Sequence, residues 1–216
     1  MAQSVSINTD RPDQSDGTYT LTKNAFQIEN GITLAKETFV NNLMLRYGAT
    51  NSTEIRLLID AGKENGLFGL KPLTISAKQR ILEQKKWIPS MTLVGYATFG
   101  KLASNDFQEN KISTELKLAF ENELTDKFAV GYNIGQSESF ENLTLSLGFY
   151  YTPIDKISTF VEYFSTVSHF TQEHNFDTGI LYLLSPVLQI DFAIGHSIFA
   201  VDKRFFTTFG ISYLFN

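Results

Sequence analysis

The chain has 216 residues, enough for one domain, of which 43% are hydrophobic, 19% charged and 13% aromatic. This composition excludes a disordered chain, and the net charge of −5, with acidic and basic residues interspersed, leaves no basic stripe for nucleic acid. Cysteine is absent, which excludes disulfides and thiolate chemistry.

The first two dozen residues come before any alternating pattern. The start, Met1-Ala2-Gln3-Ser4, contains a small residue of the kind that precedes a signal-peptidase cleavage point, with an initiator Met placed in front. We therefore expect an exported chain from which the signal peptide has been removed. Residues 1–24 are predicted to form a periplasmic segment distinct from the rest.

Apolar and polar residues alternate with a period of two from Ala25 to the C-terminus, in runs of about ten residues separated by turn signals. The pattern predicts about twelve strands, which make residues 25–216 one all-β domain. In chain order they are residues 25–35, 38–48, 53–62, 72–82, 90–99, 111–122, 127–135, 142–152, 156–165, 175–184, 187–195 and 204–215.

Each predicted strand has one apolar face and one polar face. In the last strand Phe209, Ile211 and Tyr213 lie on one face, with Thr208 and Ser212 on the other. In the remaining strands the charged residues collect on the second face. A ten-residue strand tilted by about 40° spans roughly 25 Å, which is the height of the apolar band of an outer-membrane barrel.

Two kinds of barrel fit this alternation: a membrane barrel with its apolar face toward lipid, and a lipocalin-type calyx with that face inside. Strand length, the even strand number and aromatic residues near strand ends favour the membrane. Tight connections alternate with longer ones at residues 63–71, 100–110, 166–174 and 196–203. We predict a transmembrane antiparallel β-barrel of about 12 strands with short periplasmic turns and longer outer loops.

Several short segments resemble one family of outer-membrane proteins. They are Thr9-Asp10-Arg11-Pro12-Asp13-Gln14, Phe26-Gln27-Ile28-Glu29-Asn30-Gly31, Leu45-Arg46-Tyr47-Gly48, Glu54-Ile55-Arg56-Leu57, Gly131-Tyr132-Asn133, Phe160-Val161-Glu162-Tyr163 and Gly210-Ile211-Ser212-Tyr213. In their order along the chain they resemble the proteins labelled transporters, or the MetA-pathway of phenol degradation family. The resemblance implies an outer-membrane barrel that passes small compounds, aromatic ones among them. The chain departs from the usual pattern by ending on Asn216 after the aromatic Phe215.

The second face of the strands and the N-terminal segment both carry charges, and a charge in a narrow lumen needs a partner or water. Arg11 is expected to be the bridging group, because its planar fork can hold a carboxylate bidentately. Two alternatives remain for the segment: a plug that enters the lumen, or a disordered periplasmic tail. The residues predicted to line or fill the lumen are Asp10, Arg11, Asp13, Glu29, Arg46, Glu54, Arg56, Asp60, Lys78, Arg80, Glu115, Lys117 and Glu162.

An enzymatic function has weak support. The three histidines, His169, His174 and His196, all lie in predicted outer loops. Pairing His169 with Ser168, or His196 with Ser197, gives a Ser/His pair without an orienting acid, and His169 with His174 lacks the further ligands of a metal site. We expect no catalytic residue, no metal and no cofactor.

The predicted function is passive or gated transport of small solutes across the outer membrane, with lipid around the barrel. The alternative is a sealed structural or accessory barrel that binds other envelope proteins within a larger complex. An outer-membrane hydrolase is a third, weaker alternative. The sequence does not identify the solute.

Overall fold

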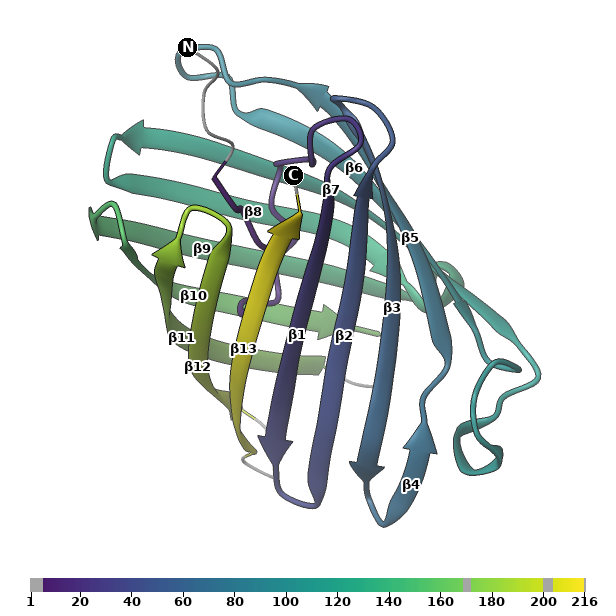
Figure 1. The fold of residues 1–216 in the computed structure, drawn as a ribbon. Helices are drawn as coiled ribbons and strands as arrows, with labels where there is room; N and C mark the ends of the chain where they lie inside the picture. The colour runs from purple at the N-terminus through teal and green to yellow at the C-terminus, as the bar shows by residue number, and fades with distance from the viewer. Residues whose placement is uncertain (1–5, 169–171, 200–203, 216) are drawn as a thin grey trace.

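The structure is a computed structural model that describes residues 6–168, 172–199 and 204–215, and its architecture is a closed antiparallel β-barrel (Figure 1). Twelve strands form the ring, as predicted. They are β1 (Phe26–Ala35), β2 (Thr38–Gly48), β3 (Thr53–Glu64), β5 (Leu73–Leu82), β6 (Ser90–Phe99), β7 (Ile112–Thr125), β8 (Phe128–Ser137), β9 (Asn142–Ile154), β10 (Ile157–Val167), β11 (Gln172–Ser185), β12 (Leu188–Ile198) and β13 (Phe205–Phe215).

Each ring strand pairs with its neighbours along the chain, and β1 closes the ring by pairing with β13. A thirteenth strand, β4 (Leu67–Leu70), pairs only with the end of β3 and is not one of the twelve. Two short 3-10 helices, at Asn105–Phe107 and Glu138–Phe140, lie in the connections. No helix in the described ranges has both the length and the apolar character needed to cross a membrane.

The prediction of a long loop at residues 63–71 is wrong, because most of these residues form the hairpin of β3 and β4. Asn65 and Gly66 make its two-residue turn, with φ of 49° and 87°. Positive φ at both central positions is what Asn-Gly favours in a hairpin. The predicted loop at 166–174 is also too long, because β11 begins at Gln172, and residues 169–171 and 200–203 of the predicted loops lie outside the described residues.

The two described ends of the chain lie at the same end of the barrel, which is the end with the tight turns (Figure 1). These connections include residues 126–127, 155–156 and 186–187. The longest connection at the opposite end among the described residues is 100–111, although 36–37 there is a two-residue turn. The predicted asymmetry of turns and loops therefore holds for most connections, but not for 36–37, nor for 83–89, a seven-residue connection at the end with the tight turns.

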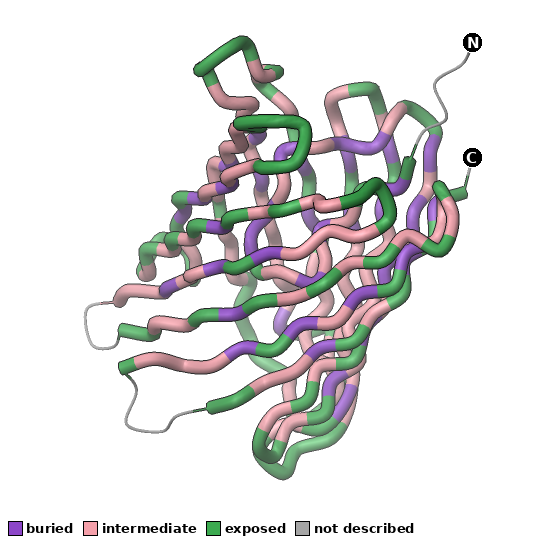
Figure 2. The backbone as a smooth tube through the Cα atoms, turned by 90° about the vertical axis from the view of Figure 1, so that its left-hand side faces the viewer, coloured by how far each residue is buried: buried purple, intermediate pink, exposed green. Residues whose placement is uncertain are grey.

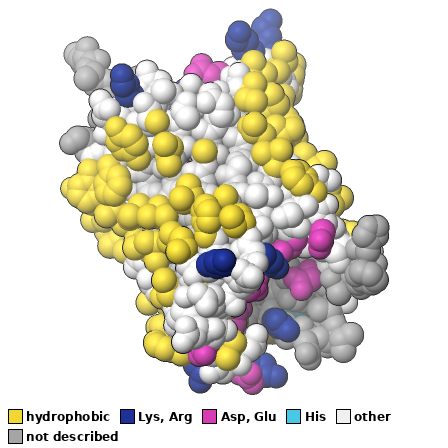
Figure 3. Space-filling model, turned by 90° about the vertical axis from the view of Figure 1, so that its right-hand side faces the viewer, with side chains coloured by type: hydrophobic (Ala, Val, Ile, Leu, Met, Phe, Trp, Pro, Cys, Tyr) yellow, Lys and Arg dark blue, Asp and Glu magenta, His cyan; other side chains and the backbone are white. Residues whose placement is uncertain are grey.

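The strands expose their apolar faces and bury their polar ones. On β13, Thr208 and Ser212 are buried, while Phe209 and Ile211 are 51% and 49% exposed. Burial alternates in this way along the strands (Figure 2), and hydrophobic side chains spread over the outer wall (Figure 3). A soluble calyx would place the faces the other way round, so this barrel has the polarity of one surrounded by lipid.

Candidate functional site: the lumen and the N-terminal segment

The N-terminal segment, defined here as residues 6–25, runs inside the barrel without forming a strand (Figure 1). Near its start, Ile7 donates a backbone hydrogen bond to the carbonyl of Pro186 at 2.7 Å. Near its end, Leu21 donates from its backbone to the Glu54 carboxylate at 2.8 Å and packs with Ile7 and Leu214 in a small apolar cluster. Both ends are thereby attached near the tight turns, and the stretch between them reaches into the lumen.

Asp10 lies among three cations from neighbouring strands. Its carboxylate is 2.8 Å from Arg56 Nη1, 2.9 Å from Lys78 Nζ and 3.6 Å from Arg46 Nη2, and all four residues are buried. Arg46 and Arg56 are directly opposite each other in the β2–β3 register, so their like charges need a shared anion. Burial alone would raise the pKa of Asp10, but Arg46, Lys78 and Arg56 hold it well below its usual value.

Two glutamates complete the cluster around Arg46. Its Nη1 is 2.5 Å from Glu29 Oε1 and its Nε is 2.7 Å from Glu54 Oε1. Glu29 also accepts the backbone N–H of Asp10 at 3.2 Å. Four strands, β1, β2, β3 and β5, and the N-terminal segment are joined by one buried network, in which the charges of both signs have partners.

Asp16 makes a second set of contacts further along the segment. Its carboxylate is 2.9 Å from Arg56 Nη1 and 3.3 Å from Lys117 Nζ, and it accepts the Tyr96 hydroxyl at 2.6 Å. Burial would raise its pKa, yet the charges of Lys117 and Arg56 lower it to about 2. Glu115 lies 3.0 Å from Lys117 Nζ. Asp16 lies in the predicted segment of residues 1–24 but was not among the residues predicted to line or fill the lumen.

Arg11 points to a different part of the wall. Its Nη2 is 3.2 Å from Asp191 Oδ1 and donates to Thr208 at 2.8 Å. Gly31 and Gly210 are opposite each other in the β1–β13 register, and a Cβ on either would fall within 2.5 Å of the Arg11 guanidinium group. This pair of glycines makes room for Arg11, and it is a signal in the sequence that the prediction did not use.

Asp13 and the residues after it contact Tyr150 on β9 and Glu162 on β10. Asp13 accepts the Tyr150 hydroxyl at 2.7 Å, and Glu162 accepts the backbone N–H of Gln14 at 2.8 Å and the hydroxyl of Ser15. Burial raises the pKa of Asp13 well above its usual value and the neighbouring charge of Glu162 raises it further, against a smaller effect of the Tyr150 hydrogen bond.

Two of the predicted residues lie apart from these contacts. Arg80 is at the mouth, where it donates to the carbonyl of Asn51 at 2.7 Å and lies 3.4 Å from Glu83. Asp60 lies toward the other end of β3 and accepts from the Asn42 amide at 3.0 Å. Both side chains point inward, Arg80 at the end of the lumen with the tight turns and Asp60 toward the opposite end.

The expectation that Arg11 is the main bridging group, in a bidentate pair, is wrong. Only one nitrogen of Arg11 contacts Asp191, whereas Asp10 contacts three cations. The reason is the composition of the wall: the strands bring three buried cations together on β2, β3 and β5, and an anion from the segment neutralises them.

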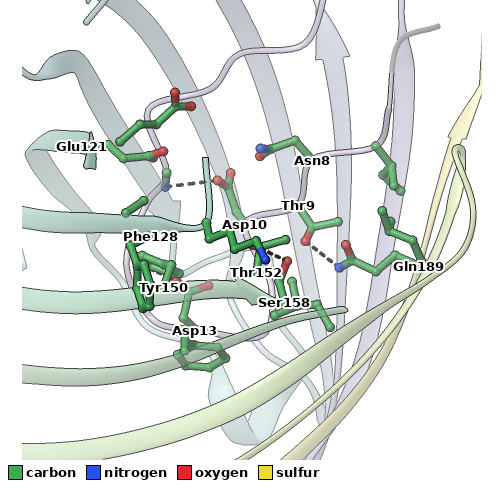
Figure 4. A pocket seen from close by; sticks show the side chains of 18 of the residues that line it. Asn8, Thr9, Asp10, Asp13, Glu121, Phe128, Tyr150, Thr152, Ser158 and Gln189 are labelled. Carbon is green, nitrogen blue, oxygen red and sulfur yellow. Dashed lines mark hydrogen bonds between the residues drawn. The ribbon is translucent and has the colours of Figure 1, made fainter. Parts of the chain in front are cut away.

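The stretch from Asp10 to Asp16 separates two cavities within the barrel. One, of about 390 Å³, lies toward the tight turns and is lined by residues such as Phe128, Tyr150 and Gln189 (Figure 4). The other, of about 640 Å³, lies toward the loops and is lined by Thr33, Phe206 and Asn175 among others. Asp10, Arg11 and Asp13 line both cavities, so the segment forms the partition between them.

The histidines lie away from the lumen network. His174 Nδ1 is 2.6 Å from the Tyr163 hydroxyl, and the His196 ring packs edge-on against Phe205. His169 lies outside the described residues. Within the described ranges no three His, Cys, Asp or Glu side chains are arranged to hold a metal ion.

Several solved outer-membrane channels share this fold. A KdgM porin in complex with disordered oligogalacturonate is 10% identical with a TM-score of 0.72, over 88% of this chain and 99% of that one. The COG4313 outer membrane channel from Pseudomonas putida F1 is 12% identical with a TM-score of 0.70, over 94% and 100%. The CymD monoaromatic hydrocarbon channel is 9% identical with a TM-score of 0.53, over 90% and 88%. At these identities the likeness is one of fold.

No curated protein sequence matches the chain significantly. The family profile described as "Putative MetA-pathway of phenol degradation" matches residues 9–215, which include the N-terminal segment from Thr9 onward and every strand. This confirms the resemblance drawn from the short sequence segments. The chain belongs to that family, and it has the fold of these porins and outer-membrane channels.

Proposed function

We propose that the barrel is a channel for small solutes and that its N-terminal segment is a gate that closes the lumen. The observation that carries the proposal is the position of the stretch from Asp10 to Asp16, between two cavities and bound to both sides of the wall. Eight strands enclose only side chains and sixteen enclose an aqueous channel. A ring of twelve leaves a space that one inserted segment can fill.

The class of solute is also a proposal. The structural neighbours are named as a channel for monoaromatic hydrocarbons and a porin with bound oligogalacturonate, both small-solute proteins. The cavity toward the loops mixes aromatic side chains, Tyr96, Phe164 and Phe206, with polar ones, Asn42 and Asn175. This lining suits small solutes that have both an apolar surface and polar groups. We propose further that outer-membrane lipid covers the apolar wall and that a signal peptide is removed on export.

Deleting residues up to Thr20 tests the gate. The deletion leaves Leu21 and its packing against Leu214, and it opens the lumen to water that can hydrate the cations which Asp10 and Asp16 neutralise, so the barrel should still fold, as judged by its heat-dependent mobility in detergent gels. Conductance in planar lipid bilayers should rise, because the partition between the two cavities is gone.

Equal conductance of the deleted and full-length chains would contradict the gate. If neither conducts, the channel function itself fails. The dense ion-pair network inside the barrel would then favour the rival function, a sealed accessory barrel, and co-purification with other envelope proteins would be the next measurement.

A further inference from the structure

The charges inside the barrel are divided between two parts of the wall. The basic residues Arg46, Arg56, Lys78 and Lys117 come from β2, β3, β5 and β7. The acidic residues Glu162, Asp177 and Asp191 come from the consecutive strands β10, β11 and β12 and are buried. The lumen therefore has a basic part and an acidic part.

The N-terminal segment neutralises these two parts unequally. On the basic part, Asp10 and Asp16 add to the strand glutamates, so every one of the four cations has an anionic partner. On the acidic part, the segment supplies one cation, Arg11, which pairs with Asp191.

Three carboxylates have no cationic partner among the described residues: Glu162 and Asp177 of the acidic part, and Asp13 of the N-terminal segment beside them. Glu162 and Asp177 are directly opposite each other in the β10–β11 register, on the inward face of both strands. Asp13 and Glu162 accept hydrogen bonds from uncharged donors only. The cations nearby in the network, Arg11 and Lys117, already pair with other carboxylates.

Asp177 has the fewest interactions of these three carboxylates. It is only 1% exposed, and neither of its carboxylate oxygens has a hydrogen-bond partner in the described structure. A buried polar group without a partner is costly, and a carboxylate beside a second carboxylate is more so. The Asp177 carboxylate therefore does not stabilise the fold, because an amide or an apolar side chain at this position would reduce the free energy of unfolding less.

We propose that Asp13, Glu162 and Asp177 give the lumen a preference for cationic over anionic solutes, amines and small monovalent cations being the class that fits. The inference rests on the proposed channel function. Carboxylates in a low-dielectric wall are poorly screened, so their field acts on solutes in the adjoining cavities, both of which Asp13 lines. Acidic side chains around a pore select cations by the same effect.

The test is the reversal potential of the full-length chain in planar bilayers under a KCl gradient, at pH 7 and again at pH 9. The second pH is needed because burial raises the pKa of Asp13, whose surroundings are Glu162, Asp177, Tyr150 and Asp10. The wild-type chain should pass K⁺ in preference to Cl⁻, and the preference should be at least as large at pH 9.

Asp177→Asn removes one of the three charges and no hydrogen bond, so it should fold and lower the permeability ratio of K⁺ to Cl⁻ by about two-fold or more. Glu162→Gln, which keeps an acceptor for Gln14 and Ser15, should lower the same ratio. The matched control is Asp155→Asn, the same charge change in an exposed tight turn, which should leave the ratio unchanged.

Conductance without cation preference at either pH, or a preference that both lumen variants leave intact, would overturn this inference while leaving the channel function standing. Absence of any conductance both in the wild-type chain and in the chain deleted up to Thr20 would overturn the channel function and this inference together. If only the deleted chain conducts, the permeability ratio of K⁺ to Cl⁻ is compared in that chain with and without Asp177→Asn, and an unchanged ratio would overturn this inference alone. A change in stability alone, with an unaltered permeability ratio, would assign the three carboxylates a structural role and also overturn it.

Discussion

Asp10 is the residue on which the attachment of the N-terminal segment depends most. It is the common anion of Arg46, Arg56 and Lys78, which come from three strands. Removing one partner of a buried ion pair leaves the other charge buried without a counter-charge. The resulting loss of folding stability is much larger than the net stabilisation that the intact pair gives. One residue of the segment therefore controls whether three buried cations are neutralised.

Asp10→Asn should destabilise the folded barrel by about 3–5 kcal/mol, measured as a lower midpoint of thermal unfolding in detergent. The contribution of a carboxylate with a lowered pKa is present above its ordinary pKa and is lost only as the pH falls through the lowered value. The difference from wild type should therefore persist between about pH 8 and pH 5. Asp106→Asn, in an exposed loop, is the control, and equal midpoints for Asp10→Asn and wild type would contradict this role.

At the scale of single residues, the sequence predicted which side chains face the lumen better than it predicted which of them pair. The inward position of Arg46, Glu54 and Lys78 follows from the period-two alternation. Their partners depend on the register between strands and on the path of an irregular segment. Asp16 was missed because it lies outside the strands and also beyond Thr9–Gln14, the stretch whose charges led to the prediction of Asp10, Arg11 and Asp13.

At the scale of elements, the strands were predicted correctly where one of their faces is apolar, and their ends were misjudged where the apolar face stops. β11 begins at Gln172, three residues before the predicted start, and its first residues, Gln172, Glu173 and His174, are all polar. A strand that extends past the membrane no longer needs an apolar face, so the alternation disappears while the hydrogen bonding continues. The β3–β4 hairpin had a local signal, Asn65-Gly66, that the alternation alone does not use.

The neighbouring residues Leu145 and Thr144 on β9 lie at nearly the same height along the barrel and point to opposite faces. They therefore test which face of the strand is on the outside. Leu145 is 37% exposed on the outer wall, whereas the hydroxyl oxygen of Thr144 is buried inside the barrel. Arginine on the lipid face costs up to about 2–4 kcal/mol, while in the lumen it can be hydrated or paired. Leu145→Arg should therefore give a much lower yield of folded barrel in lipid vesicles than Thr144→Arg. Similar yields for the two variants would contradict the assigned orientation.

At the scale of the whole molecule, the barrel and the segment form one unit whose inside is held together by charges and whose outside is apolar. The segment is attached near the tight turns at both of its ends, and its middle is bound to opposite parts of the wall. Opening the lumen therefore requires the middle of the segment to leave the wall while the ends stay in place. The segment can therefore move as a gate without changing the fold, because the strand pairings stay the same when its middle leaves the wall.

A covalent lock between the segment and the wall tests this movement directly. The hydroxyl oxygens of Ser15 in the segment and Ser146 on β9 are 2.7 Å apart, so cysteines at both positions are placed to form a disulfide. The chain has no other cysteine, so no competing bond can form within it. We expect the oxidised Ser15→Cys, Ser146→Cys chain to conduct much less than the wild type in planar bilayers, and a reductant to restore its conductance. Each single cysteine variant should be insensitive to the reductant. If the oxidised chain conducts as well as the reduced one, with the disulfide verified by mass, the middle of the segment is not the gate, and solutes pass it while it remains bound to the wall.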